Sequence, residues 1–227
     1  MTPARDRILA SIRDGLVRAV LPDAGAARDR PWPPAARDAS AEALVAQFSS
    51  VLTALSGHVH RAAAADVAEV VLAIAAGYGA ASCLSWDDEH LGCPGLLATL
   101  ASRGLVRVPY DLPADAERRL QVAQDLADIG LGLTGAHAAL AESGTLVLVG
   151  GPGRGRLASL LPPVHIAIVP ERRMRPSLAV LVREEPRLLD GGSNVVLVSG
   201  PSRTADIEMT LSHGVHGPKH IHVILTS

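Results

Sequence analysis

From residue 58 onward the chain alternates short apolar runs with segments of helical spacing, and this alternation limits the fold more than any other feature. Apolar runs bounded by Gly, Pro or polar residues indicate strands, whereas apolar residues every three or four positions indicate helices. The pattern predicts strands at 58–60, 81–85 and 105–108, and helices at 66–76, 94–102 and 114–127. We therefore expect an α/β fold with a mostly parallel sheet flanked by helices and right-handed crossovers.

The C-terminal third continues the alternation. It predicts strands at 145–149, 163–169, 194–198 and 221–225, and helices at 176–183 and 205–212. Thr204 would cap the last of these helices, and Asp206 and Glu208 in its first turn would match the helix dipole. His165 lies in an apolar run, where a histidine is most often a hydrogen-bonded core residue.

The first 39 residues differ from the rest. Residues 6–20 place apolar side chains at helical spacing, and the segment 25–40 carries three prolines around Trp32. Proline-rich segments of this kind are linkers or extended arms. We therefore expect an N-terminal helix and arm at 1–39, followed by an α/β domain at 40–227. The N-terminal helix could pack on a second copy of the chain or on another partner.

Composition argues against several classes of partner. The net charge of −2 and the aromatic content of 2% give no basis for binding nucleic acid or an anionic membrane. The N-terminus lacks the apolar core of a signal peptide, and no run reaches the roughly 18 apolar residues that a membrane span needs. We expect a cytoplasmic protein without a membrane span.

The cysteines and histidines give little support for a resident cofactor. Two cysteines, Cys83 and Cys93, cannot hold an iron–sulfur cluster unaided. His58 and His60 share one face of an expected strand and could form a metal pair, although a plain strand face is the commoner outcome. Four C-terminal histidines at 213, 216, 220 and 222 match no familiar zinc spacing. We expect no metal or other cofactor in this chain.

Two glycine-rich segments are candidates for ligand binding. The segment 130–135 matches G-x-G-x-x-G, but a helix is expected before it and no acidic residue follows at about 20 positions, so we reject a Rossmann dinucleotide site. The segment 150–155 follows an expected strand, and its backbone N–H groups and Arg154 could approach an anion. No Gly-Lys-Ser/Thr follows, so it is no P-loop. A flexible turn explains this second segment equally well.

The chemically richest candidate is the segment 199–206, Ser-Gly-Pro-Ser-Arg-Thr-Ala-Asp. Gly200 and Pro201 end the preceding strand, and a helix cap alone would need just one of the polar side chains that follow. Arg203 offers paired donors to an anion, while the neighbouring hydroxyls add neutral ones. Other expected strand ends and loops complete the predicted ligand-binding set: Thr134, Thr145, Gly151, Gly153, Arg154, Ser199, Gly200, Ser202, Arg203, Thr204 and Asp206.

Five motifs in order resemble those of the LUD domain family. They are the segment 128–136, Ala141-Glu-Ser-Gly-Thr145, Leu161-Pro-Pro-Val-His165, the segment 199–208 and Gly214-Val-His-Gly-Pro218. The resemblance implies a fold like that of the NagB, ribose-5-phosphate isomerase (RpiA) and CoA-transferase group. It also implies a role in oxidising L-lactate to pyruvate beside iron–sulfur lactate-utilization proteins. Because this chain lacks their cysteine motifs, we expect it to be a non-redox component that positions partners or binds a small organic anion.

An enzymatic alternative stays open. In the CoA transferases of the wider fold group a glutamate in a Glu-x-Gly motif attacks an acyl thioester, and Glu142-Ser-Gly144 is similar. A carboxylate can be a covalent nucleophile when its site desolvates and orients it, which makes Glu142 the catalytic candidate. Glu142 could instead simply end a helix, with Gly144 as the residue after the helix cap.

Overall fold

The computed structural model describes residues 3–18, 39–110, 115–126, 128–188, 190, 192–205, 211–213 and 217–227. It divides into two compact units, Met1–Pro34 and Ala35–Ser227. The first unit contains α1 (Pro3–Arg18), which matches the helix expected at 6–20 and exposes the apolar side chains of Ile8, Ile12 and Leu16. No helix of these described ranges is both long and apolar enough to cross a bilayer.

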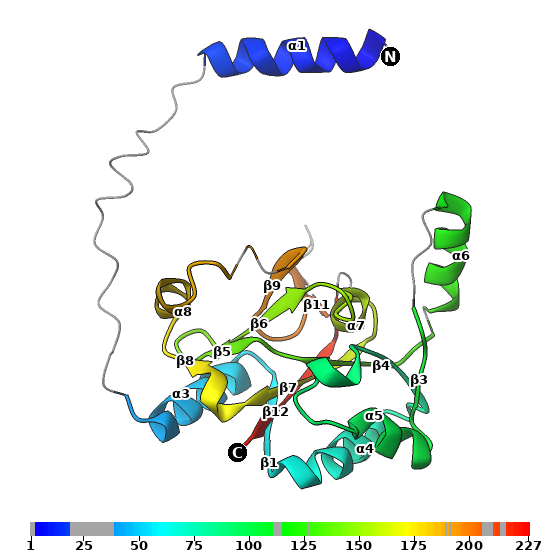
Figure 1. The fold of residues 1–227 in the computed structure, drawn as a ribbon, viewed down its shortest axis with the longest axis vertical. Helices are drawn as coiled ribbons and strands as arrows, with labels where there is room; N and C mark the ends of the chain where they lie inside the picture. Colours follow the sequence, from blue (N-terminus) through cyan, green and yellow to red (C-terminus); the bar gives the residue numbers. More distant parts are fainter. Residues whose placement is uncertain are drawn as a thin grey trace. The chain divides into compact units, whose positions relative to one another are not determined.

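A six-stranded sheet forms the centre of the second unit (Figure 1). Its order is β1-β12-β7-β4-β2-β3, and every neighbouring pair is parallel. This arrangement confirms the expected α/β fold. The strands are β1 (His58–Ala62), β2 (Ser82–Ser85), β3 (Val106–Arg107), β4 (Leu131–Gly135), β7 (Val164–Pro170) and β12 (His220–Thr226).

A four-stranded sheet of order β8-β5-β6-β9 adds a second layer. The β5–β6 and β6–β9 pairs are antiparallel, and the β5–β8 pair is parallel. A small cluster of buried side chains from this sheet and its surroundings includes Val147, Val149, Leu181 and Leu188. The strands are β5 (Ala138–Leu140), β6 (Thr145–Gly150), β8 (Met174–Arg175) and β9 (Asn194–Val198).

Helices connect and cover these strands. Ser40 caps α3 by accepting a hydrogen bond from the Ala43 N–H at 3.2 Å, and Ser177 caps α8 through the Val180 N–H at 3.4 Å. The α-helices are α3 (Ala41–Ala54), α4 (Val67–Gly77), α5 (Leu96–Ser102), α6 (Ala116–Asp125), α7 (Leu157–Leu160) and α8 (Leu178–Glu184). Three short 3-10 helices are η1 (Ala64–Asp66), η2 (Asp88–His90) and η3 (Glu171–Arg173).

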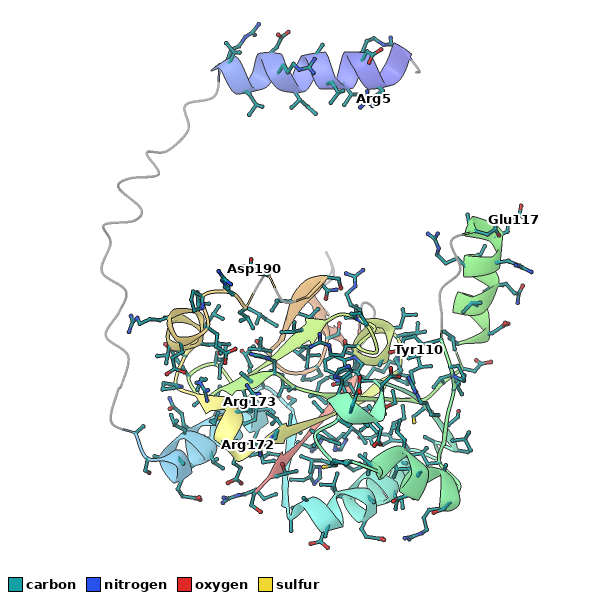
Figure 2. The ribbon with its side chains drawn as sticks, viewed as in Figure 1. Arg5, Tyr110, Glu117, Arg172, Arg173 and Asp190 are labelled. Carbon is teal, nitrogen blue, oxygen red and sulfur yellow. The ribbon has the colours of Figure 1, made fainter. Side chains whose placement is uncertain are left out.

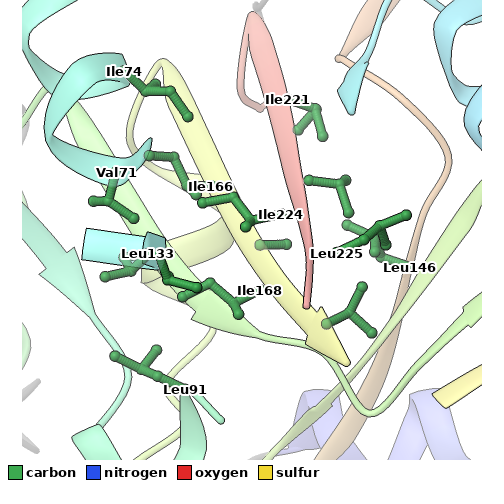
Figure 3. Packing of buried hydrophobic residues seen from close by; sticks show 14 of the residues in the cluster. Val71, Ile74, Leu91, Leu133, Leu146, Ile166, Ile168, Ile221, Ile224 and Leu225 are labelled. Atoms are coloured by element: carbon green, nitrogen blue, oxygen red, sulfur yellow. The ribbon is translucent and has the colours of Figure 1, made fainter. Parts of the chain in front are cut away.

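The main core lies on both faces of the parallel sheet. Val71 and Ile74 of α4 pack near Ile166 of β7 on one face, and Leu146 of β6 lies beside Leu225 of β12 on the other (Figure 3). All five side chains are buried. The nearly continuous apolar runs of β7 and β12 follow from this, because a parallel sheet that is covered on both faces needs apolar residues at every position.

The helix expected at 205–212 is wrong where the structure describes it. Arg203–Ala205 forms β10 and Leu211–His213 forms β11, and the two strands pair antiparallel. Thr204 is therefore a strand residue and not a helix cap. Pairing between two short extended segments overrides the local helical spacing. Asp206 and Glu208 lie outside the described residues.

The region 130–144 also differs from expectation. Its G-x-G-x-x-G segment, where no strand was expected, contains the buried strand β4. A Cβ on Gly132 would lie 1.8 Å from the Ala158 carbonyl oxygen, and one on Gly135 would lie 2.1 Å from the His90 carbonyl oxygen. These glycines therefore allow α7 and η2 to pack directly against the strand. The alternative that Glu142 ends a helix is wrong, because residues 141–144 form the turn between β5 and β6.

Candidate functional site

The carboxyl ends of β2, β3, β4 and β7 meet along one edge of the parallel sheet. In open α/β sheets this is the edge where ligands bind. Polar side chains follow each strand end: Asp87 and His90 after β2, Tyr110 after β3, His137 after β4 and Arg173 after β7. Figure 2 marks Tyr110 and Arg173. The sheet topology therefore gathers residues that are far apart in the sequence.

The glycine-rich segment expected at 150–155 forms a tight turn beside this edge. Gly151 and Arg154 exchange two backbone hydrogen bonds, with N···O distances of 3.3 and 2.9 Å. The Asp87 N–H donates to the Gly153 carbonyl at 2.8 Å. The Tyr110 hydroxyl donates to the carbonyl of Gly155 at 3.2 Å. Hydrogen bonds from two different strand ends thus hold the turn in place, which does not support a merely flexible turn.

Two glycines of the turn are required by close packing. Gly153 has a φ of 68°, and a Cβ there would lie 2.5 Å from Asp87 Oδ2. A Cβ on Gly155 would lie 2.6 Å from the Tyr110 ring. Any larger residue at 153 would meet both backbone strain and the carboxylate.

A small cavity of about 160 Å³ lies between this turn and the ends of β2 and β4; we call it the small cavity. Its lining is strongly cationic and includes two arginines, two histidines and an indole. The lining residues are Trp86, His90, Ala136, His137, Val149, Arg154 and Arg173. A carboxylate or phosphate is the ligand that such a set recognises, because guanidinium groups bind both in paired hydrogen bonds.

Glu185 contacts two residues that line the small cavity. Its Oε2 lies 2.6 Å from His137 Nε2, and its Oε1 lies 4.0 Å from an Arg173 Nη1. The carboxylate accepts a hydrogen bond from the Nε2–H of His137, which fixes the orientation of the ring and its tautomer. Arg154 has a buried Nε without a hydrogen-bond partner among the described residues, which leaves this donor for a ligand.

A large cavity of about 630 Å³ lies on the other side of the turn; we call it the large cavity. It combines charged groups with apolar walls. It is lined by Asp87, Arg107, Pro109, Tyr110, Gly151, Gly153, Gly155, Arg156, Leu157 and Leu160. The Arg107 guanidinium donates to Asp87 Oδ1 at 2.5 Å, which holds the cation at the cavity wall. A third cavity, of about 420 Å³, shares His137, Val149 and Arg154 with the small one.

The structure places part of the predicted binding set at these cavities. Arg154 lines the small cavity, and Gly151 and Gly153 line the large one. Thr134 lines none of the three: it is buried in β4, and its hydroxyl lies 2.8 Å from His165 Nε2. His165 is likewise fully buried, which agrees with its expected role as a core residue.

The predicted residues from the segment 199–202 gather elsewhere. The Thr145 hydroxyl lies 2.7 Å from both the Ser143 and Ser199 hydroxyls, at the opposite end of β6 from the glycine turn. The Ser202 N–H donates to the Pro218 carbonyl at 2.9 Å. Gly200, with a φ of 89°, lets its backbone approach Leu55 of the α3 end. These residues do not line the three cavities.

The remaining candidates stand apart from the cavities. Glu142 is exposed on the β5–β6 turn, where its N–H donates to the Pro176 carbonyl at 3.0 Å. Arg203 and Thr204 lie in β10. The structure therefore does not bring Glu142 and the glycine turn into one site.

Several site residues escaped the sequence prediction. Asp87 and Tyr110 lie two positions after the ends of expected strands and His90 lies five positions after one, so a search for polar residues after strand ends could have found them. His137 and Glu185 carry no such signal, because β4 was not expected and they are 48 positions apart. The approach of α8 to the end of β4 creates this pair.

Four histidines and a tyrosine form a second polar cluster at the other edge of the sheet, where β1 and β12 begin. His222 Nδ1 lies 3.1 Å from His60 Nε2, and its Nε2 lies 3.1 Å from the Tyr78 hydroxyl. Burial and the neighbouring histidines lower the pKa of His222 to about 4. Within the described ranges, no group of three or more His, Cys, Asp or Glu side chains is arranged to hold a metal ion.

Comparisons with known proteins give the family. The LUD domain model matches residues 45–226. The chain is similar to "Lactate utilization protein C" of Halalkalibacterium halodurans, with 41% identity over 145 residues, and of Exiguobacterium sp., with 32% identity over 200 residues. These matches cover 62% and 86% of this chain; the first spans only 60% of its relative's length and the second 83%.

A solved structure supports the fold. The crystal structure of a DUF162 family protein from Deinococcus radiodurans superposes with a TM-score of 0.59 at 22% identity. The match covers 84% of this chain and the whole of that one. Together with the family model, which spans most of the α/β unit, these findings give one conclusion: the chain belongs to the LUD domain family.

Proposed function

We propose that this protein is a non-redox component of a lactate-utilization system and that its small cavity binds the carboxylate of a 2-hydroxy or 2-oxo acid such as lactate or pyruvate. The observation that carries the proposal is the convergence of Arg154, Arg173, His90 and His137 on a cavity of about 160 Å³. The relatives named lactate utilization protein C support the assignment to lactate.

The residues of the small cavity divide the recognition of such an acid between them. The guanidinium groups of Arg154 and Arg173 supply charge and paired donors for the carboxylate. The imidazoles of His90 and His137 supply donors or acceptors for the hydroxyl or oxo oxygen at the neighbouring carbon. Glu185 holds His137 in one tautomer, so the hydrogen-bonding character of that ring is set before a ligand arrives.

The state of the cysteines supports a redox centre in partner proteins. Cys83 and Cys93 are both buried and free. Burial raises the pKa of Cys83 to about 11 and also raises the pKa of Cys93. An iron–sulfur cluster is typically held by four cysteine thiolates, and this chain has only two cysteines. We therefore assign electron transfer to iron–sulfur partner proteins, with this chain contributing a site for the organic acid.

Titration calorimetry with the full-length protein tests the site. We expect L-lactate or pyruvate to bind, and Arg173→Gln or Arg154→Gln to weaken the binding at least tenfold, because each removes a charge-assisted contact. Arg172→Gln is the matched control: Arg172 is the preceding residue of η3, is exposed and does not line the small cavity. Equal affinities for the wild type and both cavity variants would contradict the proposal, as would the absence of binding at millimolar acid.

A further inference from the structure

The large cavity differs from the small one in both size and composition. At about 630 Å³ it falls in the range of pockets that enclose a cofactor-sized molecule, and a three-carbon acid would leave most of it empty. It shares no lining residue with the small cavity. The two cavities can therefore bind different ligands.

Part of the lining of the large cavity is suited to an anion. Arg107 and Arg156 bring two guanidinium groups, and Arg107 is fixed by Asp87. The Nε of Arg107 is buried and has no hydrogen-bond partner within the described ranges. Guanidinium donors of this kind recognise phosphate oxygens in paired hydrogen bonds.

The glycine turn adds main-chain groups to the same lining. Gly151, Gly153 and Gly155 all line the cavity, with the Asp87 carboxylate close to Gly153 and the Tyr110 ring close to Gly155. The N–H groups of Gly153 and Gly155 have no acceptor among the residues that the structure describes. The Arg154 N–H between them donates to the Gly151 carbonyl at 2.9 Å, so the turn offers two separate main-chain donors, each able to bind one phosphate oxygen.

The large cavity also has apolar lining residues and a fixed aromatic ring, which lies against Gly155 of the glycine turn. The Tyr110 hydroxyl donates to the Gly155 carbonyl, so the phenol ring stays at the wall. Pro109, Leu157 and Leu160 line the same cavity, and Leu160 is 39% exposed. A planar ring can stack on such a surface, as nucleic-acid bases stack on aromatic side chains. Burial of the exposed leucine side chain would add to that.

We propose that the large cavity is a nucleotide site, with the phosphates held by Arg107, Arg156 and the glycine turn and the base placed against Tyr110 and its apolar neighbours. Inorganic phosphate alone would use only the cationic and main-chain donors. An uncharged aromatic molecule would use only the ring and the apolar side chains. A nucleotide uses both, at the edge of the sheet where parallel α/β proteins bind ligands. This proposal does not rest on the assignment of lactate to the small cavity.

The test is titration calorimetry of the full-length protein with ADP, and with pyrophosphate and adenosine as its two halves. We expect saturable binding of ADP and at least tenfold weaker binding of each half. Arg156→Gln and Tyr110→Leu should each weaken ADP binding at least fivefold. Arg156 is exposed, so the first variant is expected to fold normally. Arg172→Gln, which does not line the large cavity, should bind ADP like the wild type.

Other outcomes would overturn the nucleotide assignment. Binding of pyrophosphate as tight as that of ADP would reduce the cavity to a simple phosphate site. Unchanged ADP affinity in both cavity variants, or no binding at millimolar ADP, would remove the site altogether. Arg173→Gln should leave ADP binding intact, so a failure of the lactate assignment is distinguishable from a failure of this one.

Discussion

His165 makes the stability of this protein depend on pH in a predictable way. The side chain is 0% exposed in β7; its Nε2 lies 2.8 Å from the Thr134 hydroxyl, and its Nδ1 is buried without a partner in the described part of the chain. Burial lowers the pKa of His165 to about 4 from an ordinary value of 6.5. The folded protein therefore keeps this imidazole neutral at pH values where an unfolded chain protonates it.

The sign and size of the effect follow from this difference in pKa. Because the folded pKa is depressed, the contribution of His165 to stability is complete above pH 6.5 and is lost as the pH falls toward about 4. Between pH 7.5 and pH 5.0 the linkage amounts to about 2 kcal/mol for this one group. That loss is a sizeable part of the roughly 5–15 kcal/mol that stabilises a typical domain.

Urea unfolding of the wild type and His165→Gln at the two pH values isolates the effect. Glutamine cannot titrate, so the wild type should lose about 2 kcal/mol more than the variant when the pH is lowered. His222, whose pKa is also lowered to about 4, contributes to both proteins and cancels in the comparison. Equal losses for the two proteins would refute the reasoning.

An NMR titration of the native protein provides a second measurement that needs no folded variant. The imidazole carbon-bound protons of His165 should keep the chemical shifts of the neutral form down to about pH 5. A midpoint near 6.5 for this residue in folded protein would show that burial does not hold it neutral.

Two further predictions concern residues that the motifs singled out. Gly132→Ala should lower the free energy of unfolding by about 3 kcal/mol, because its Cβ would overlap the Ala158 carbonyl. Gly77→Ala is the control and should not destabilise the protein, because no atom lies within 4 Å of the new Cβ. Chemical denaturation of the two variants and the wild type measures the difference. Glu142 is exposed on a turn, so Glu142→Gln should change the free energy of unfolding by less than about 0.5 kcal/mol. For the same reason, mass spectrometry of the wild type should find no hydroxamate at Glu142 after incubation with acetyl-CoA and hydroxylamine. A trapped adduct would restore the transferase alternative.

The strands that were predicted and the strand that was missed differ in one physical respect. β7 and β12 are long runs of apolar, mostly β-branched residues, so their sequences show burial on both faces. β4 lies between β7 and β2 and is equally buried, but Gly132 and Gly135 interrupt its apolar run. Those glycines allow other segments to approach the strand closely, and no local sequence pattern predicts that approach.

The error at 205–212 has the opposite origin. The spacing of apolar residues there is helical, and the local preference was clear. The structure instead pairs Arg203–Ala205 with Leu211–His213 through backbone hydrogen bonds. Short segments have weak intrinsic preferences, so pairing between them decides their conformation.

Only part of the candidate site could be predicted from the residues that follow expected strands. The glycine turn and Arg154 were found because they follow a strand that the sequence displays clearly. The residues opposite them come from the ends of four other strands, and their meeting depends on the order β7-β4-β2-β3, which a single sequence does not give.

The glycine turn connects the two proposed sites physically. The Gly153 carbonyl accepts the Asp87 N–H, and the Gly155 carbonyl accepts both the Tyr110 hydroxyl and the Trp86 indole N–H at 3.1 Å. Trp86 lines the small cavity, whereas Asp87 and Tyr110 line the large one. A ligand that orders the turn from one side therefore acts on hydrogen bonds that also shape the other cavity. By thermodynamic linkage, any resulting change in affinity for an acid in the small cavity must equal the reciprocal change for a nucleotide in the large one.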